Sequence, residues 1–353
     1  MVELLSCLKQ AVESGASDLF FVAGSPVSLK LDGQLKVVGE EKILPPDTQR
    51  LISEIYSMAG RSMERYLQTK DDDFSFAMPG LARFRVNTYH QRGSMAAVIR
   101  VVSFDIPDYK SLGIPEAIMD LAGISHGLIL VTGTAGSGKS TTQACIIDRI
   151  NRTRDCHIIT LEDPIEFLHR NHKSIVSQRE IAIDSVDYLS ALRSCLRQAP
   201  DVILLGEMRD AETIHTAMIA AETGHTVIAT LHTMGAANTI DRIVDAFPST
   251  QQSQIRVQLS MVLQAVVSQE LLPDTQGGRV PIFELMHMTP AIRNLIREGK
   301  THQIDNAIAT GAQAGMWTRN QSILQLCQQG KLSPEVALEH SDNPDQLRRR
   351  LGK

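Results

Sequence analysis

The chain has 353 residues, a length typical of about two folded domains. Of these residues 43% are hydrophobic and 21% charged, a composition that excludes a disordered, collagen-like or low-complexity protein. Its formal net charge of −5 and its aromatic content of only 4% argue against nucleic acid as a partner. No stretch approaches the roughly 18 uninterrupted apolar residues of a membrane span, and five scattered cysteines without a Cys-x-x-Cys pair argue against a disulfide framework or a zinc site.

The first hundred residues predict a strand-rich α+β domain. Helical periodicity covers residues 1–14, whose acidic residues distinguish the segment from a signal peptide, and roughly residues 46–68. The runs of strand composition are FFVAG, VSLKLDGQLKVVG, DDFSFAM, ARFRVNTYHQRG and AAVIRVV. Asp32-Gly33 predicts a hairpin turn within the second run. We expect a first domain over residues 1–106 and, without a signal peptide or membrane span, a cytoplasmic protein.

A different pattern follows a proline-containing segment, which we interpret as a linker over residues 107–117. From 118 to 340, short apolar runs are mostly continuous and alternate with helical segments, which predicts a parallel sheet covered on both faces. These runs are GLILVTG, CHIITLED, SIVSQREI, DVILLGE and HTVIATLH. Beyond about residue 250 the pattern looks mostly helical, through QQSQIRVQLSMVLQAVVSQELL and TPAIRNLIREG, and residues 341–353 form a polar tail.

The clearest functional motif is a G-x-x-x-x-G-K-S sequence at residues 133–140, between an apolar strand and a helix. In this Walker A or P-loop pattern the glycines let backbone N–H groups surround a phosphate, beside the N-terminus of the following helix. Lys139 is expected to neutralise phosphate oxygens, and the Ser140 hydroxyl to coordinate Mg²⁺. The predicted ATP-binding residues of the loop are Gly133, Ala135, Gly136, Ser137, Gly138, Lys139 and Ser140.

Acidic residues follow two other predicted strands. Asp201–Glu207 reads as a buried strand that ends in an acid, a Walker B pattern in which Glu207 would hold Mg²⁺ or its waters. Glu162, Asp163 and Glu166 follow the strand HIITL, at the carboxyl end that borders a nucleotide crevice. One of these acids is expected to orient the attacking water.

His225 and His232 lie at the two ends of the strand TVIATL. A zinc pair is one interpretation, but no further ligand lies at a suitable spacing. We favour a pair that senses the γ-phosphate, with structural histidines as the alternative.

These motifs together resemble a known family. The strings GTAGSGKST, TLEDPIEF, LRQAPDVILLGEMRD and AAETGHTVIATLHT are similar, in order, to the Walker A, Asp, Walker B and His boxes of the secretion-superfamily ATPases, which drive type II secretion and type IV pili. PAIRNLIREGKTHQI and GMWT near the C-terminus, with GASDLFF, DDFSFA and ARFRVN near the N-terminus, resemble the branch that retracts type IV pili. The lack of a four-cysteine zinc insert near residues 270–280 points the same way.

The resemblance implies an N-terminal PAS-like α+β domain followed by a RecA-like P-loop ATPase domain with a mostly helical C-terminal part. It implies a homo-hexameric motor that hydrolyses ATP to ADP and acts on a pilus platform protein at the cytoplasmic face of the inner membrane. By resemblance, Thr141 would lie near the nucleotide, Glu166 would activate water, Glu207 would be the Walker B acid, and His225 and His232 the His-box pair. Arg85 and Arg100 match paired arginines that the family directs at the nucleotide across a domain or subunit interface, with Arg83 and Arg92 as the alternatives on the same strands or nearby.

One departure from the family pattern keeps alternatives open. Ala199 stands where retraction enzymes often carry an acid, and there the chain resembles the accessory retraction enzymes. Besides an accessory enzyme, the alternatives are an assembly or secretion ATPase, a DNA-translocating RecA-like motor, and a regulatory subunit that binds nucleotide without hydrolysing it.

Overall fold

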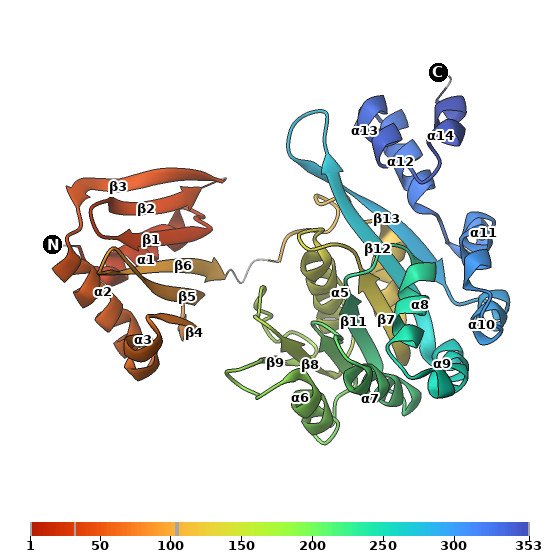
Figure 1. Cartoon of the computed structure of the whole chain (residues 1–353), viewed down its shortest axis with the longest axis horizontal. Coiled ribbons are helices and arrows are strands. Elements are labelled where there is room, and N and C mark those ends of the chain that lie inside the picture. Colours follow the sequence, from red (N-terminus) through yellow and green to blue (C-terminus); the bar gives the residue numbers. More distant parts are fainter. Residues whose placement is uncertain (1, 32, 103–105, 352–353) are drawn as a thin grey trace. The chain divides into compact units, whose positions relative to one another are not determined.

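The computed structural model describes residues 2–31, 33–102 and 106–351, in two compact units (Figure 1). Unit 1 comprises residues 1–105 with the short segment Glu166–Leu168, and unit 2 comprises residues 106–165 and 169–353. Both units combine sheets and helices, so the chain is a mixed α/β protein. None of the described helices combines the length and apolar character that a bilayer crossing requires.

Unit 1 is built on a six-stranded sheet in which all neighbouring strands run antiparallel. The strand order is β3-β2-β1-β6-β5-β4. The strands are β1 (Asp18–Val22), β2 (Pro26–Leu31), β3 (Gln34–Lys42), β4 (Asp71–Met78), β5 (Ala82–Gln91) and β6 (Ser94–Val102), and the helices are α1 (Leu4–Glu13), α2 (Pro45–Met58) and α3 (Glu64–Thr69). The predicted strands of this region are therefore confirmed. Asp32 of the predicted hairpin turn lies outside the described residues, but β2 and β3 pair on either side of it.

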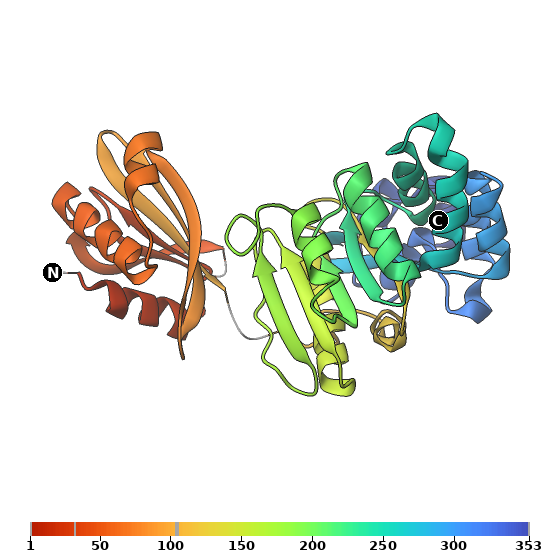
Figure 2. The ribbon, with the colours of Figure 1, turned by 90° about the horizontal axis from the view of Figure 1, so that it is seen from below.

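The sheet of unit 1 has one apolar and one polar face. In β5 the buried residues Phe84 and Val86 alternate with the more exposed Arg85, as the two-residue period of a strand requires. The apolar side chains join those of α1 and α2 in one core, on the face that these helices cover (Figure 2). Polar side chains such as Arg85 are therefore left on the opposite face.

The helix predicted over residues 46–68 is in fact two helices. α2 ends at Met58, and Gly60 has a φ of 60°, a left-handed conformation that glycine adopts at little cost and that stops the helix. The chain then turns before α3 begins at Glu64.

Unit 2 contains a seven-stranded sheet in the order β13-β12-β7-β11-β10-β8-β9, with β9 and β13 at its edges (Figure 1). The strands are β7 (Gly127–Thr132), β8 (His157–Glu162), β9 (Ile175–Glu180), β10 (Val202–Leu205), β11 (Thr226–Leu231), β12 (Leu263–Pro273) and β13 (Arg279–His287). All pairings are parallel except that of β12 with β13.

Helices cover both faces of the central strands, as the continuous apolar runs predicted. Leu128 and Leu130 of β7 pack into one cluster with α6 (Tyr188–Cys195), α7 (Ala211–Glu222), α8 (Ala236–Asp245) and α9 (Ser249–Val262). Ile129 and Val131 point to the other face and pack with α4 (Glu116–Met119) and α5 (Lys139–Thr153). Because both faces are covered, every residue of β7 and β11 is buried.

The helical interpretation of residues 250–272 is wrong beyond Val262. α9 ends at this residue and the chain continues directly into β12, which pairs with β7 and then turns back as β13. Glutamine, leucine and alanine give LQAVVSQELL the composition of a helix, but its burial beside β7 favours a strand, because tertiary packing outweighs weak local propensity.

The remaining segments of unit 2 pack around this sheet. Residues 107–117, interpreted above as a linker, belong to unit 2, where Ile114 is buried. The later helices are α10 (Pro290–Arg297), α11 (Ile304–Ala309), α12 (Arg319–Gln328), α13 (Pro334–Glu339) and α14 (Pro344–Arg350). α14 lies within the predicted polar tail, and its Leu347 is buried in a small apolar cluster with the outer ends of β12 and β13.

Candidate active site

The loop between β7 and α5 is held tightly against β12. Gly133 has a φ of 143°, and a Cβ added to it would lie 2.1 Å from the carbonyl oxygen of Gln269 on β12. Gly138 also has a positive φ, of 86°, and its added Cβ would lie 2.9 Å from the side-chain nitrogen of Gln269. Gly133 is therefore required both by its backbone conformation and by the close approach of the β12 backbone, whereas at Gly138 the positive φ is the reason, because the Gln269 side chain can move.

Polar groups inside the loop are suited to an anion. The Ser137 hydroxyl is buried and has no hydrogen-bond partner among the described residues. The Lys139 ammonium group donates to the carbonyl oxygens of Gly133 and Thr134, at 2.9 and 2.8 Å. A buried hydroxyl and a lysine folded over the loop are groups that a bound phosphate can engage, at the start of a helix. The residues therefore fit the predicted phosphate-binding role.

The other predicted residues of the loop lie around this pair. Ala135 and Gly136 are exposed at the tip, and Ser140 and Thr141 are partly buried in the first turn of α5. The following Thr142 donates from its hydroxyl to the Gln269 side-chain oxygen at 2.7 Å. Gln269 was missed by the sequence analysis because its segment was interpreted as helix. It links β12 to both ends of the loop.

The parallel strands bring the other motifs to the same edge of the sheet as the loop. β11 lies beside β7, with Leu231 opposite Thr132, and β10 follows on its other side. His232 therefore emerges next to the loop, and Glu207 emerges one strand further along, two residues beyond the end of β10. β8 is next, and its last residue is Glu162. This is the carboxyl edge, where open α/β sheets bind ligands.

Glu207 is at the centre of a small ionic cluster. Its carboxylate lies 2.8 Å from a guanidinium nitrogen of Arg209 and 3.3 Å from Nε2 of His232. Partial burial acts to raise the pKa of Glu207, but the hydrogen bond and charge of Arg209, with the charges of His232 and Lys139, outweigh burial and lower it. Glu207 is therefore ionised at neutral pH, as a Mg²⁺-binding carboxylate must be. Arg209 was not identified from the sequence, where it is an ordinary loop cation.

The two candidate acids after β8 have different surroundings. Glu162 accepts hydrogen bonds from the Thr160 hydroxyl at 2.6 Å and from the Gln178 amide at 3.2 Å, which restrain its orientation. Glu166 is exposed and has no hydrogen-bond or ion-pair partner in the part of the chain that the structure describes. Its carboxylate is therefore available for another contact.

The structure does not bring His225 to the loop. His225 precedes β11, and its neighbour Thr226 pairs with Gly127 at the opposite edge of the sheet. A six-residue strand spans roughly 20 Å, so within one chain His225 is too far from the loop to contact the same phosphate. Its imidazole Nδ1 lies 2.9 Å from the carbonyl oxygen of Ala220 at the end of α7. The predicted His225–His232 pair is therefore separated within one chain, because the two residues flank opposite ends of one strand, and of the two only His232 lies beside the loop.

Ala199 also lies at the amino edge of the sheet, before β10, with a φ of 49°. Aspartate and asparagine tolerate this left-handed conformation better than alanine does. The departure from the family pattern at this position therefore lies at the edge of the sheet opposite the phosphate loop.

Arg85 and Arg100 are neighbours in unit 1. They are directly opposite each other on β5 and β6 and line a cavity of about 260 Å³. Arg85 forms a two-point ion pair with Asp73, at 2.8 and 3.3 Å, and Arg100 lies 2.9 Å from Asp18. The family resemblance named these two arginines as a pair. The structure places them on neighbouring strands, each with an acidic partner that the sequence did not indicate.

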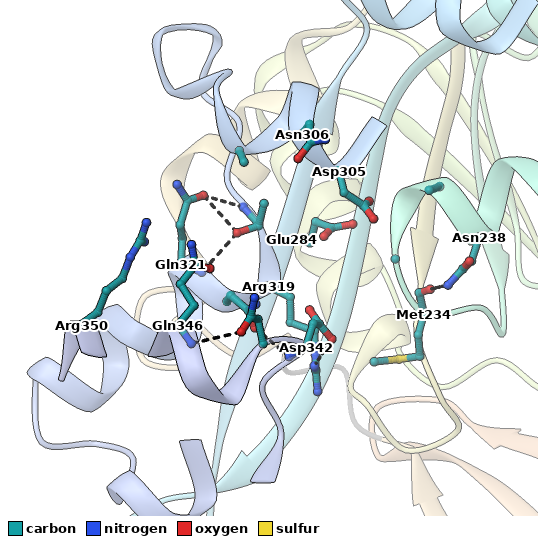
Figure 3. Close-up of a pocket in the computed structure, with 16 residues that line it drawn as sticks. Met234, Asn238, Glu284, Asp305, Asn306, Arg319, Gln321, Asp342, Gln346 and Arg350 are labelled. Atoms are coloured by element: carbon teal, nitrogen blue, oxygen red, sulfur yellow. Dashed lines mark hydrogen bonds and ion pairs between the residues drawn. The ribbon is translucent and has the colours of Figure 1, made fainter. Parts of the chain in front are cut away.

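A separate cavity of about 530 Å³ lies in unit 2 between α8, α11, α12 and α14 (Figure 3). Arg319 crosses it and forms ion pairs with Glu270 and Asp342. None of the residues predicted for the nucleotide site lines this cavity.

Comparisons with known proteins agree with these features. Residues 2–337 match the family described as Type II/IV secretion system protein. The chain is 44% identical over 345 residues to the "Type IV pilus retractation ATPase PilT" of Pseudomonas aeruginosa, which covers 98% of this chain and 99% of the relative. It is 41% identical over 345 residues to a "Twitching motility protein" of Neisseria gonorrhoeae, with 98% and 92% covered. A crystal structure described as the pilus retraction motor PilT with bound ADP aligns with a TM-score of 0.90 and 46% identity, covering 99% of this chain and 100% of that one.

Proposed function

The chain belongs to the Type II/IV secretion system protein family, and from this membership we propose that it is an ATPase motor that powers type IV pilus retraction and twitching motility. The observation that carries the proposal is the glycine-rich loop after β7, with Glu207 and His232 beside it at the carboxyl edge of the sheet. Its support is the similarity of nearly the whole chain to a pilus retraction ATPase and to a retraction motor that binds ADP.

The reaction assigned to this site is hydrolysis of ATP to ADP and phosphate. The loop from Gly133 to Gly138 surrounds the phosphates with backbone N–H groups, and Lys139 balances their charge. Ser140 and Glu207 would hold Mg²⁺, which neutralises charge on the phosphate oxygens when it is bound. Such transfer depends mainly on positioning and charge, which are what these residues supply.

The remaining site residues have proposed roles in activation. Glu166, whose carboxylate has no partner in the described chain, orients the attacking water, and His232 senses the γ-phosphate through its contact with Glu207. Arg85 and Arg100 supply positive charge to the triphosphate during turnover, from the same chain or from another copy. Because both arginines are paired with acids, this role requires them to exchange those partners for phosphate.

The proposal also assigns a fold family to each of the two units. We assign a PAS-like fold to residues 1–106, from the antiparallel sheet with helices on one face, and a RecA-like ATPase fold to residues 118–340, from the parallel sheet with its glycine-rich loop. The working assembly is a homo-hexamer, and its partner is a pilus platform protein at the cytoplasmic face of the inner membrane. Similarity to pilus retraction proteins supports both assignments.

Deletion of the gene in the native host tests the function directly. We expect excess surface pili that do not retract, and wild-type behaviour after complementation with the intact chain but not with Lys139→Ala. Lys173→Ala is the matched control, since this lysine is exposed and outside the loop. Bald cells would indicate an assembly ATPase, and a purified chain without ATPase activity would contradict hydrolysis.

A further inference from the structure

The loop that carries Glu166 is long and irregular. It joins β8 to β9 over residues 163–174, all of which the structure describes, and it forms neither helix nor strand. A loop of this length has many backbone conformations open to it unless other contacts select one. The position of the Glu166 carboxylate therefore depends on what holds the loop.

Two side chains of β9 hold this loop on either side of Glu166. The carboxylate of Glu180 accepts a hydrogen bond from the backbone N–H of Ile165 at 3.3 Å, and both residues are buried. The side-chain oxygen of Gln178 accepts a hydrogen bond from the backbone N–H of His169 at 2.8 Å. Only three residues lie between the two anchored ones, and Glu166 is the first of them.

The register of the sheet explains why both anchors come from one strand. Gln178 and Glu180 are two residues apart, so their side chains leave β9 on the same face. β9 pairs with β8 so that Gln178 lies opposite Thr160 and Glu180 lies opposite Glu162. The Gln178 amide also donates to the Glu162 carboxylate at 3.2 Å, which links this anchor to the end of β8. The loop is therefore tied to the two strands that it connects.

We propose that Gln178 and Glu180 are positioning residues for ATP hydrolysis, which fix the backbone on either side of Glu166 and thereby the place of its carboxylate. A general base must lie within hydrogen-bond reach of the attacking water, and a displacement of about 1 Å can lower the rate about 10²-fold. Neither anchoring side chain needs to touch the nucleotide for this role. The inference rests on the proposed ATPase function and on the role of Glu166 in it.

The test combines substitutions of the two anchors with Glu166→Gln in the full chain. Gln178→Met and Glu180→Leu keep much of the side-chain volume but remove the acceptors for the N–H groups of His169 and Ile165. We expect each variant to keep its affinity for a fluorescent ADP analogue and to lose about tenfold in kcat. In the Glu166→Gln background the same substitutions should lower kcat less than about twofold further, because residues that act through one group do not have additive effects.

Two further variants separate the anchoring hydrogen bonds from general effects on the loop. Glu180→Gln keeps an oxygen that can accept from the Ile165 N–H, so its kcat should exceed that of Glu180→Leu by about fivefold. Asn171→Ala is the matched control, since it removes an exposed side-chain oxygen of the same loop that accepts from the backbone N–H of Val176 at 2.9 Å. That bond lies beyond His169, so kcat should stay within about twofold of the wild type.

Additive losses in the double variants, or an unchanged kcat in both single variants, would overturn the inference. So would an equal loss of kcat in Asn171→Ala, or a loss of nucleotide affinity that matches the loss of kcat, because either would indicate a general structural role. If Glu180→Leu does not fold, Gln178→Met carries the same test at the other end of the segment. Wild-type turnover in Glu166→Gln would remove this inference but leave the ATPase function, whereas a wild-type chain that binds ATP without hydrolysing it would remove both.

Discussion

Gly133 is the residue at which the phosphate loop depends most on a distant part of the chain. Gly133→Ala would place a Cβ within 2.1 Å of the Gln269 carbonyl oxygen. We expect the variant to lose at least about 2 kcal/mol of unfolding free energy and to weaken nucleotide binding more than about tenfold, because the loop must move away from β12. Calorimetry of ATP-analogue binding and thermal unfolding measure both quantities.

Gly136→Ala is the control for this comparison. Gly136 has a φ of 75°, but nothing lies within 4 Å of its added Cβ, so this variant has backbone strain without a collision. Equal losses in the two variants would show that contact with Gln269 is unimportant.

The free carboxylate of Glu166 leads to a second prediction at the scale of the residue. Glu166→Gln should bind nucleotide normally and lower turnover about 10²-fold or more, because an amide is a poor base for water. Steady-state phosphate release and fluorescent-nucleotide titration separate the two effects. If the variant hydrolyses ATP at the wild-type rate, the role passes to Glu162, and Glu162→Gln should then show the loss.

At the scale of the element, Glu284 connects β13 to the start of α8. Its carboxylate oxygen accepts a hydrogen bond of 2.8 Å from the backbone N–H of Ala236, and its side chain is only 8% exposed. Burial, with help from Asp305 and Asp342, raises the pKa of Glu284 above its ordinary value of 4.5. The folded chain thus retains a proton that the unfolded chain releases, so stability falls as the pH rises from 4.5 through the folded value.

Glu284→Gln should remove this loss of stability at high pH, because the amide oxygen can still accept the hydrogen bond from the Ala236 backbone N–H and the side chain carries no charge. At neutral pH we expect the variant to be more stable than the wild type, and the gain to shrink as the pH falls toward the ordinary pKa of a glutamate side chain. Chemical denaturation of unit 2 at several pH values measures the difference. A variant less stable than the wild type at neutral pH would show that the charge itself is needed.

At the scale of the whole molecule, the proposed hexamer predicts that activity depends on assembly. The ATPase rate per subunit of the wild type should rise with protein concentration over the range in which rings form. Arg85→Ala should show nearly the same low rate at every concentration, with nucleotide affinity unchanged, because the positive charge that assembly supplies would be missing. Rates and sedimentation measured on the same samples relate activity to assembly.

The choice of arginine matters for this test. Arg85→Ala leaves Asp73, which is about half exposed, in contact with solvent, whereas Arg100→Ala would leave the buried Asp18 without its cation. Arg100→Lys is therefore the better variant at the second position. A wild-type rate per subunit that stays constant while rings form would contradict a role for charge supplied by assembly.

Local pattern was enough to predict the elements that carry the chemistry. The sequence predicted the G-x-x-x-x-G-K-S loop between a buried strand and a helix, the acid after β10 and the strands of unit 1. These features could be predicted because residue period, turn residues and motif spacing are local properties of the chain. The choice of Arg85 and Arg100 came instead from the family resemblance, and the structure places the two residues opposite each other on neighbouring strands.

The tertiary structure alone decided which of these residues meet. β12 is a strand because β7 lies beside it, and Gln269 can restrain the phosphate loop only through that long-range pairing. The strand β11 likewise separates His225 from His232 by its own length. Such contacts join residues far apart in the chain, so their formation depends on sheet order and burial, which no local pattern specifies.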